Sequence, residues 1–235
     1  MIHFPMGTAM TTRLKIDFVS DVSCPWCVIG LRALDQALAR VAPEVQAELY
    51  FQPFELNPNM APEGEDITEH ITRKYGISEV QAEANRAAIR ERGAALGFTF
   101  SGSNGAGGGR SRIYNTFDAH RLLHWAETLG LGQQKALKEA LFTAYFTDGL
   151  SPASHEVLLK VVASVGLDAA RAAAILASSE FAADVRERAD FFTAHGIRSV
   201  PAIIINDRHL ISGGQPVEVF EQALRQLAEA EAQPS

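Results

Sequence analysis

Cys24 and Cys27 are the residues of this 235-residue chain best suited to chemistry, and they are its only cysteines. Pro25 and Trp26 separate them, and a helical pattern of apolar residues begins at the first cysteine. A thiolate at a helix N-terminus faces free backbone N–H groups and the positive end of the helix dipole, which stabilise the anion. We therefore expect Cys24 to be acidic and nucleophilic. Cys27 follows about one turn later on the same face, where it could resolve a mixed disulfide on Cys24.

Two other interpretations of the pair stay open. Free cysteines are often ordinary buried thiols. A zinc site would need a second pair of ligands, and the chain has no further cysteine. His120 and His124 have the spacing of a helical metal-binding pair, but Arg121 stands where a metalloprotease carries its general base. We interpret these histidines as helix-surface or groove residues and predict no metal site.

A second motif, Val200-Pro201, opens a strand-like segment near the other end of the chain. Proline lacks a backbone donor and is the one residue that commonly follows a cis peptide bond. It also often begins a strand for structural reasons alone. Because this strand should pack beside the helix of Cys24, we favour a cis Pro201 close to that cysteine.

The elements around these motifs predict an α/β protein. Strand patterns occur at 14–19, 47–54, 201–206 and 209–211, with a turn at 206–208, and helical periodicity occurs at 24–41 and 216–230. Strand-helix-strand thus opens the chain, and strand-strand-helix closes it. This is the thioredoxin fold with a large all-helical insertion between its two halves. The predicted parts are a first thioredoxin-like segment at 13–61, an inserted helical domain at 62–196 and a second thioredoxin-like segment at 197–232.

The inserted segment has helical patterns throughout and no convincing strand. Its candidate helices are 78–96, 115–129, 133–146, 152–165, 168–177 and 180–195. Ser78 and Gln81 have the spacing of a capping box. Residues 101–109 are rich in glycine but lack the strand and helix that flank a phosphate-binding loop, so we interpret them as a flexible connector.

The charge and the apolar content of the chain limit the classes of partner and the cellular location that we expect. A formal net charge of −7 argues against nucleic acid, which requires a basic surface. The N-terminus has no basic residue before Arg13 and no continuous apolar run, unlike a signal peptide. No later stretch approaches the ~18 apolar residues of a membrane span. We expect a soluble cytoplasmic protein that acts on small molecules or proteins. The oligomeric state and the direction of electron flow stay open.

The chain resembles the DsbA-like branch of the thioredoxin superfamily, and within it the FrnE group. The resemblance is carried by residues 17–30 (DFVSDVSCPWCVIG), 53–58 (PFELNP), 115–122 (NTFDAHRL) and 200–201, and it extends from about 15 to 230. It implies a cytoplasmic protein disulfide oxidoreductase or isomerase. Cys24 would be the attacking cysteine, Cys27 the resolving one and Pro201 the cis-proline. Pro25, Trp26 and Val200 would join Pro201 in contacting the substrate, and no cofactor is implied.

The same branch also resembles kappa-class glutathione transferases and 2-hydroxychromene-2-carboxylate isomerases, which carry serine at the position of Cys24. The cysteine here, together with Cys27, favours dithiol chemistry, with glutathione as a possible co-substrate. Asn57 falls in a segment that helps form the glutathione site of those relatives, although it could equally be a turn residue before Pro58. The alternatives are a glutathione-dependent transferase or isomerase of a small molecule and, in another class, a redox-sensing interaction protein.

Overall fold

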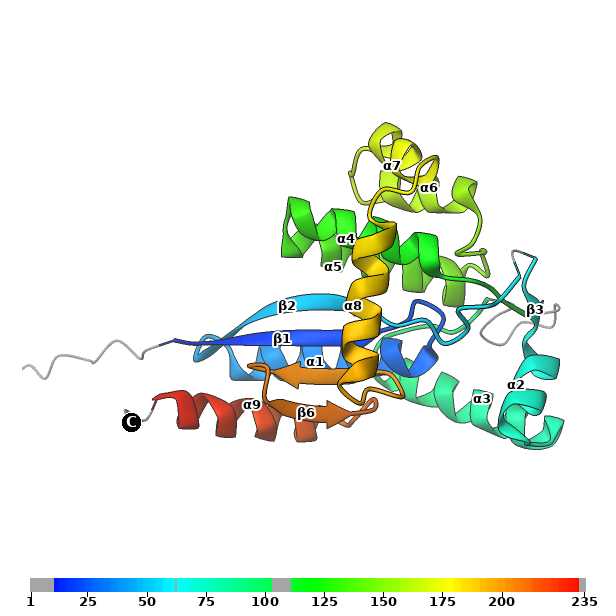
Figure 1. The fold of residues 1–235 in the computed structure, drawn as a ribbon. Coiled ribbons are helices and arrows are strands. Elements are labelled where there is room, and N and C mark those ends of the chain that lie inside the picture. The colour runs from blue at the N-terminus through cyan, green and yellow to red at the C-terminus, as the bar shows by residue number, and fades with distance from the viewer. Residues whose placement is uncertain (1–10, 62, 103–110, 233–235) are drawn as a thin grey trace, which may run out of the picture.

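The computed structural model describes residues 11–61, 63–102 and 111–232. Its main sheet has the strand order β2-β1-β5-β6 (Figure 1). β1 (Thr12–Ser20) runs parallel to β2 (Val45–Pro53), and β5 (Ala202–Ile205) runs antiparallel to β1. β6 (His209–Ser212) completes the sheet by antiparallel pairing with β5. The sheet therefore joins strands from opposite ends of the chain, as the thioredoxin fold requires.

The β5–β6 connection is a tight turn at the predicted position. Asn206 and Asp207 have φ angles of 52° and 56°. These two left-handed residues are the centre of a β-turn that the Arg208 N–H closes on the carbonyl of Ile205 at 3.2 Å, and Asn and Asp are the side chains that tolerate this conformation best after glycine. This turn fixes the register of β6 on β5, and with it the position of the loop that precedes β5.

Two helices, α1 (Pro25–Val41) and α9 (Val217–Ala232), cover one face of the sheet. Leu14, Ile16 and Phe18 alternate along β1 and are fully buried against these helices. Pro25 occupies the first turn of α1, where its missing N–H costs no helical hydrogen bond. The packing of α1 on β1 fixes the position of the loop between them, and Cys24 lies at the end of this loop.

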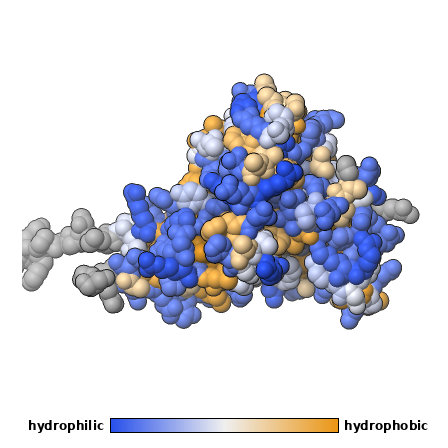
Figure 2. Space-filling view, in the orientation of Figure 1, coloured by the Kyte–Doolittle hydropathy of each residue, from blue (hydrophilic) through white to orange (hydrophobic). Residues whose placement is uncertain are grey.

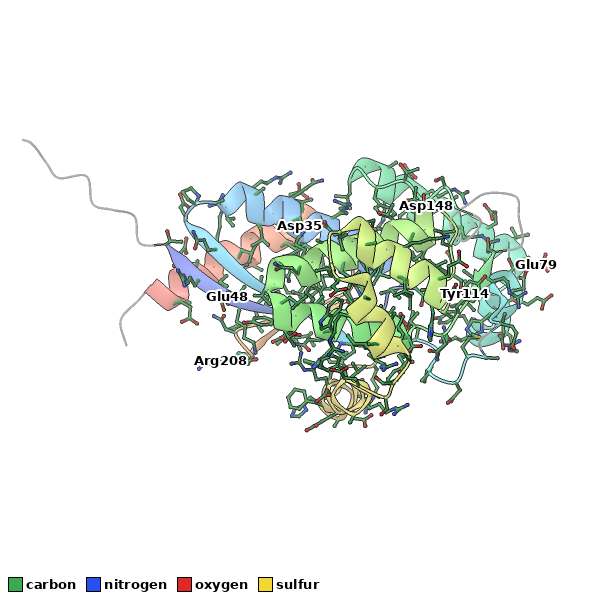
Figure 3. The ribbon with its side chains drawn as sticks, turned by 90° about the horizontal axis from the view of Figure 1, so that it is seen from above. Asp35, Glu48, Glu79, Tyr114, Asp148 and Arg208 are labelled. Atoms are coloured by element: carbon green, nitrogen blue, oxygen red, sulfur yellow. The ribbon has the colours of Figure 1, made fainter. Side chains whose placement is uncertain are left out.

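The opposite face is crossed by α8 (Ala182–Ala194), drawn in gold in Figure 1 and seen nearly end-on in Figure 3. Val19 of β1 and Ala202 of β5 point to this side and pack against Phe192 of α8 and Ile197 in a small buried cluster. The sheet is therefore covered on both faces, and the odd-numbered residues of β1 face α8.

The remaining helices lie beside and above the sheet (Figure 1). Their bounds are α2 (Ile67–Tyr75), α3 (Glu79–Ala95), α4 (Phe117–Leu129), α5 (Leu131–Phe142), a π-helical turn η1 (Thr143–Thr147), α6 (His155–Ser164) and α7 (Ala169–Leu176). α3 begins with the predicted capping box of Ser78 and Gln81. A second buried cluster joins α4, α5, α6 and α7. No helix in the described ranges is both long and apolar enough to cross a membrane.

Three expectations for the inserted segment need correction. It is not all-helical, because β3 (Glu65–Asp66) and β4 (Arg112–Ile113) pair as a second, two-stranded sheet. Strands this short leave no period to detect in a sequence. Residues 67–75 form the helix α2, which the sequence analysis did not identify. The helix expected at 133–146 changes from α to π geometry at Thr143.

The inserted segment also contributes directly to the main core. Phe98, Phe100, Phe142 and Phe146 belong to the same buried cluster as β1 and α1. The division into domains stays a prediction, and residues 103–109 of the glycine-rich segment lie outside the described part of the chain.

α5 closes the β2 edge of the sheet. Gln134 is fully buried, and its side-chain amide bonds both backbone groups of Phe51: Oε1 accepts from N–H at 2.9 Å, and Nε2 donates to the carbonyl at 3.0 Å. These two hydrogen bonds occupy backbone groups at the edge of the sheet that could otherwise pair with another strand. They also hold α5 against the sheet, where Lys135 of α5 pairs with Asp35 of α1 at 2.9 Å.

Candidate active site

The two cysteines lie together at the N-terminus of α1. Cys24 is the residue that caps the helix, and the backbone N–H of Cys27 donates to its carbonyl at 3.0 Å. Both thiols are free. The side chains differ less in exposure than the sequence suggests, because Cys24 is 4% exposed and Cys27 is 0% exposed. Cys24 is therefore buried even though it stands at the N-terminus of the helix.

The Val200-Pro201 motif meets Cys24, as expected from the fold. The Cys24 thiol donates to the carbonyl oxygen of Val200 at 3.5 Å, and the peptide bond between Val200 and Pro201 is cis. Pro201 also lies close to α1, since a Cβ added to Gly30 would be 3.0 Å from its Cγ. The absence of a side chain at Gly30 thus permits the loop and the helix to approach each other.

The two residues between the cysteines, Pro25 and Trp26, make different contacts. Pro25 begins α1, and its side chain is partly exposed. The Trp26 ring is partly buried against the main core, and the guanidinium carbon of Arg92 lies 5.1 Å from its centroid. A cation at this distance from an indole is attracted to the ring face. Trp26 therefore links the redox helix to α3.

Asn57 lies in the loop after β2, and its side-chain oxygen accepts a hydrogen bond from Lys74 Nζ at 2.8 Å. The same ammonium donates to the carbonyl of Leu56 at 2.8 Å. The loop approaches the redox centre through Leu56, whose N–H donates to Asp21 at 2.7 Å. Asn57 thus lies near the site but bonds to α2 instead of to the cysteine loop.

Asp21 organises the loop that leads to Cys24. It is buried, and its two carboxylate oxygens accept from the backbone N–H groups of Ser23 at 3.1 Å and Leu56 at 2.7 Å. Burial opposes its charge, but His120 and these two amides outweigh burial and lower the pKa of the carboxyl group. The charged carboxylate thus holds two loops together directly behind the cysteines.

His120 is not on the helix surface. It is 3% exposed, and its Nε2 atom lies 3.7 Å from Asp21 Oδ1. Burial lowers the pKa of this imidazole, which favours its neutral form. His124, one turn further along α4, is half-buried against the ring of Phe181. The structure therefore separates the two histidines, with His120 in the surroundings of the redox pair.

Lys138 of α5 is a further charged residue behind the cysteines. Its side chain is fully buried, and burial lowers the pKa of the ammonium to about 8, while Cys27, Asp21 and Cys24 favour its charge. In turn, burial and the neighbouring Cys24 raise the pKa of the Cys27 thiol well above its usual value. Neither Asp21 nor Lys138 was predicted from the sequence as a site residue. The signal for Lys138 was its position four residues from both Gln134 and Phe142, on the buried stripe of its helix.

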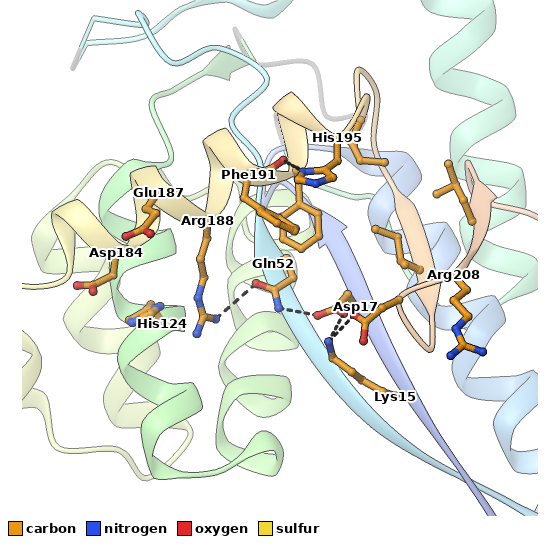
Figure 4. A pocket seen from close by; sticks show the side chains of 15 residues that line it. Lys15, Asp17, Gln52, His124, Asp184, Glu187, Arg188, Phe191, His195 and Arg208 are labelled. Carbon is orange, nitrogen blue, oxygen red and sulfur yellow. Dashed lines mark hydrogen bonds and ion pairs between the residues drawn. The ribbon is translucent and has the colours of Figure 1, made fainter.

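A cleft of about 790 Å³ lies on the sheet face that α8 crosses (Figure 4). A row of hydrogen bonds follows its floor, from Arg188 to Gln52 at 3.4 Å and from Gln52 to Asp17 at 2.6 Å. Figure 2 shows a hydrophobic area on this side of the molecule. Phe191 and Leu210, which line the cleft, are each 53% exposed. Neither cysteine lines this cleft, so it is separate from the redox pair.

The fold and the paired cysteines define a thioredoxin-fold protein with two thiols at the start of its first helix. A family model described as the DsbA-like thioredoxin domain matches residues 15–225. The chain belongs to this family.

Several known proteins are similar to this chain in sequence or in fold. The crystal structure of the probable DsbA oxidoreductase SCO1869 from Streptomyces coelicolor has a TM-score of 0.84 and 32% identity, covering 94% of this chain and 92% of that chain. The uncharacterized protein YwbO of Bacillus subtilis is 26% identical over 92% of this chain and 96% of its own length. The cytosolic disulfide reductase DsbM from Pseudomonas aeruginosa, solved with GSH, has a TM-score of 0.61 and 18% identity, covering 92% and 99% of the two chains.

Proposed function

We propose that this protein is a dithiol/disulfide oxidoreductase or isomerase of protein thiols, with Cys24 as the attacking cysteine and Cys27 as the resolving one. The observation that carries the proposal is the position of both thiols at the N-terminus of α1, where the first of them donates to the carbonyl of Val200. Attack by Cys24 would form a mixed disulfide, and attack by Cys27 on Cys24 would release the reduced substrate.

Pro25, Trp26, Val200 and Pro201 would form the surface that meets the substrate. Pro25 and Trp26 flank the first thiol on the helix side, and the loop at Val200 flanks it on the strand side. An extended peptide could align along the backbone before β5, with its disulfide directed at Cys24. Within the family, the CPWC motif and the segments around it favour the FrnE group.

Glutathione is our proposed small co-substrate, and the cytoplasm our proposed location. Both are supported by the similar fold of DsbM, described as a cytosolic disulfide reductase and solved with GSH. Asn57, held by Lys74 beside the redox loop, is the candidate contact. The second candidate function is a glutathione-dependent transferase or isomerase of a small molecule, and it is supported by the similar fold of a 2-hydroxychromene-2-carboxylate isomerase, with a TM-score of 0.66 and 14% identity. A redox-sensing interaction protein is the third.

A comparison of three assays on the same protein tests the proposal. We expect the wild type to catalyse insulin reduction with glutathione as electron donor, and Cys24→Ser to lose this activity. Glutathione conjugation to an electrophile without disulfide exchange would support the transferase instead. A partner captured in only one redox state, with neither activity, would support the sensor.

A further inference from the structure

Lys138 is a buried cation whose ammonium has no hydrogen-bond acceptor within the part of the chain that the structure describes. Its side chain is fully buried, and its Nζ atom lies 4.9 Å from the centroid of the Phe142 ring. Removing an ammonium from water is costly unless a counter-charge compensates for the lost hydration. A group that becomes negative during the reaction would supply this counter-charge.

The surroundings of Lys138 contain such a group. The Phe142 ring, over which its Nζ atom lies, belongs to the buried cluster that contains both cysteines. Cys27, Asp21 and Cys24 favour the charge of Lys138, and this charge adds to burial in lowering the pKa of His120. Asp21 is the permanent anion, but both of its oxygens already accept from backbone amides. Cys27 is fully buried, and it can change from neutral to negative.

Several buried polar atoms that lack a hydrogen-bond partner also lie close to the two cysteines. Among the described residues, Ser23 Oγ, His120 Nε2, Lys138 Nζ and His70 Nε2 are buried without a hydrogen-bond partner. Ser23 directly precedes Cys24, and His120 and Lys138 interact with Asp21 behind it. Buried polar groups are normally satisfied, so their gathering behind the redox pair indicates a site adapted to a change of charge.

We propose that Lys138 is a positioning residue for the resolving step, and that its ammonium stabilises the Cys27 thiolate that attacks the mixed disulfide on Cys24. This inference rests on the proposed function and adds to it a role for the inserted helices, because α5 supplies the charge to a cysteine on α1. Lys138 acts through Cys27 and need not contact the substrate.

The step balances without another reactant. Cys27 loses its proton, and its sulfur forms a bond to Cys24 while the bond between Cys24 and the substrate sulfur breaks. The bonding pair leaves with the substrate sulfur, which takes up a proton to become a thiol. The two cysteines are oxidised and the substrate is reduced, and Lys138 stays charged throughout. Without this charge, the burial that already raises the pKa of Cys27 would oppose the thiolate with less compensation.

A direct test measures the thiolate of Cys27 in a Cys24→Ser background, where it is the only thiol. Thiolate absorbance is titrated in this variant with and without Lys138→Met, which keeps side-chain length but removes the charge. We expect the second substitution to raise the apparent pKa of Cys27 by about one unit or more, which is a tenfold loss of thiolate near neutral pH. Lys135→Met is the matched control on the same helix, because Lys135 pairs with Asp35 at 2.9 Å and Glu139 at 2.6 Å away from the thiols.

A kinetic test uses both cysteines. The protein is mixed with excess oxidised glutathione and quenched with acid, and mass spectrometry follows conversion of the mixed disulfide into the internal disulfide. Lys138→Met should accumulate the mixed disulfide and resolve it at least about tenfold more slowly at neutral pH, with the rate recovering as pH rises. Lys138→Arg, which keeps the charge, should recover part of the rate.

The outcomes separate the two proposals. If the wild type showed no disulfide exchange, the proposed function itself would be wrong. An active wild type, with the same Cys27 titration and resolving rate in Lys138→Met, would overturn only the role of Lys138. Lys138→Gln serves as a second neutral variant. If both neutral variants failed to fold by circular dichroism, the charge would be needed for the fold, and the proposal would be wrong.

Discussion

The thiol of Cys24 donates to the carbonyl oxygen of Val200 at 3.5 Å, across 176 residues of sequence. This contact joins the start of α1 to the loop before β5, and it distinguishes the two cysteines. A substrate that reached Cys24 would do so beside the backbone of Val200, whereas Cys27 lies behind it and is fully buried.

The first prediction follows from this asymmetry. Cys27→Ser removes the resolving thiol, so incubation with oxidised glutathione should leave a stable glutathione adduct on Cys24. Cys24→Ser should form little or no adduct, because the remaining Cys27 is buried and its pKa is raised well above the usual value. Intact-mass spectrometry of both variants measures the adducts. Faster labelling of Cys27 than of Cys24 in the reduced wild type would reverse our assignment of roles.

The second prediction concerns Asp21, which bonds two backbone amides that an asparagine could not both satisfy. Asp21→Asn should lower the free energy of unfolding at neutral pH by about 1–3 kcal/mol, the cost of an unsatisfied buried group. The pKa of Asp21 is lower in the folded protein, so its stabilisation is present above the ordinary value of 3.8 and is lost as pH falls through the folded value. Denaturant unfolding should therefore show the difference between variant and wild type shrinking in acid. Asp184→Asn, at an exposed residue of α8, is the control.

Local patterns made most of the fold predictable. The period of two along β1, the helical period after Cys24 and the turn at Asn206 and Asp207 are short-range features, and each appears in the structure at the expected position. The two-residue strands β3 and β4 were missed because a pair so short is created by tertiary contact and leaves no pattern of its own.

The site was only partly predictable for a similar reason. The cysteines and Val200 lie in recognisable motifs, but their burial depends on contacts between distant segments. In the sequence His120 cannot be distinguished from an ordinary helix residue, because its contact with Asp21 depends on how α4 packs in the folded protein. Lys138 has the helical spacing of a buried position, but charged side chains are rarely fully buried, and nothing in the sequence says that this side of α5 faces Cys27.

The third prediction tests the close approach of α1 to the Val200-Pro201 loop. A Cβ at Gly30 would be 3.0 Å from Pro201 Cγ, whereas at Gly132 of α5 it would meet nothing within 4 Å. Alanine in place of a helical glycine stabilises a protein by roughly 0.5–1 kcal/mol where there is room. Gly132→Ala should show this gain in denaturant unfolding, and Gly30→Ala should lose it to crowding. Equal gains at the two positions would contradict the tight packing of helix and loop.

The last prediction concerns Glu55, at the end of β2 beside the redox loop. Burial, with the charge of Asp21, raises the pKa of its carboxyl group from 4.5 to about 7. The folded protein therefore holds a proton between pH 4.5 and 7 that the unfolded chain releases, so this group makes stability fall as pH rises through that window. After allowance for its partial exposure, we expect Glu55→Gln to raise the free energy of unfolding at pH 8 by about 1–2 kcal/mol relative to wild type, with little difference at pH 4. Glu187→Gln, at an exposed residue of α8, should change stability by less than about 0.5 kcal/mol at either pH. Chemical denaturation of the three proteins at both pH values measures the effect, and a variant that is equally stable relative to wild type at pH 4 and pH 8 would show that Glu55 titrates normally.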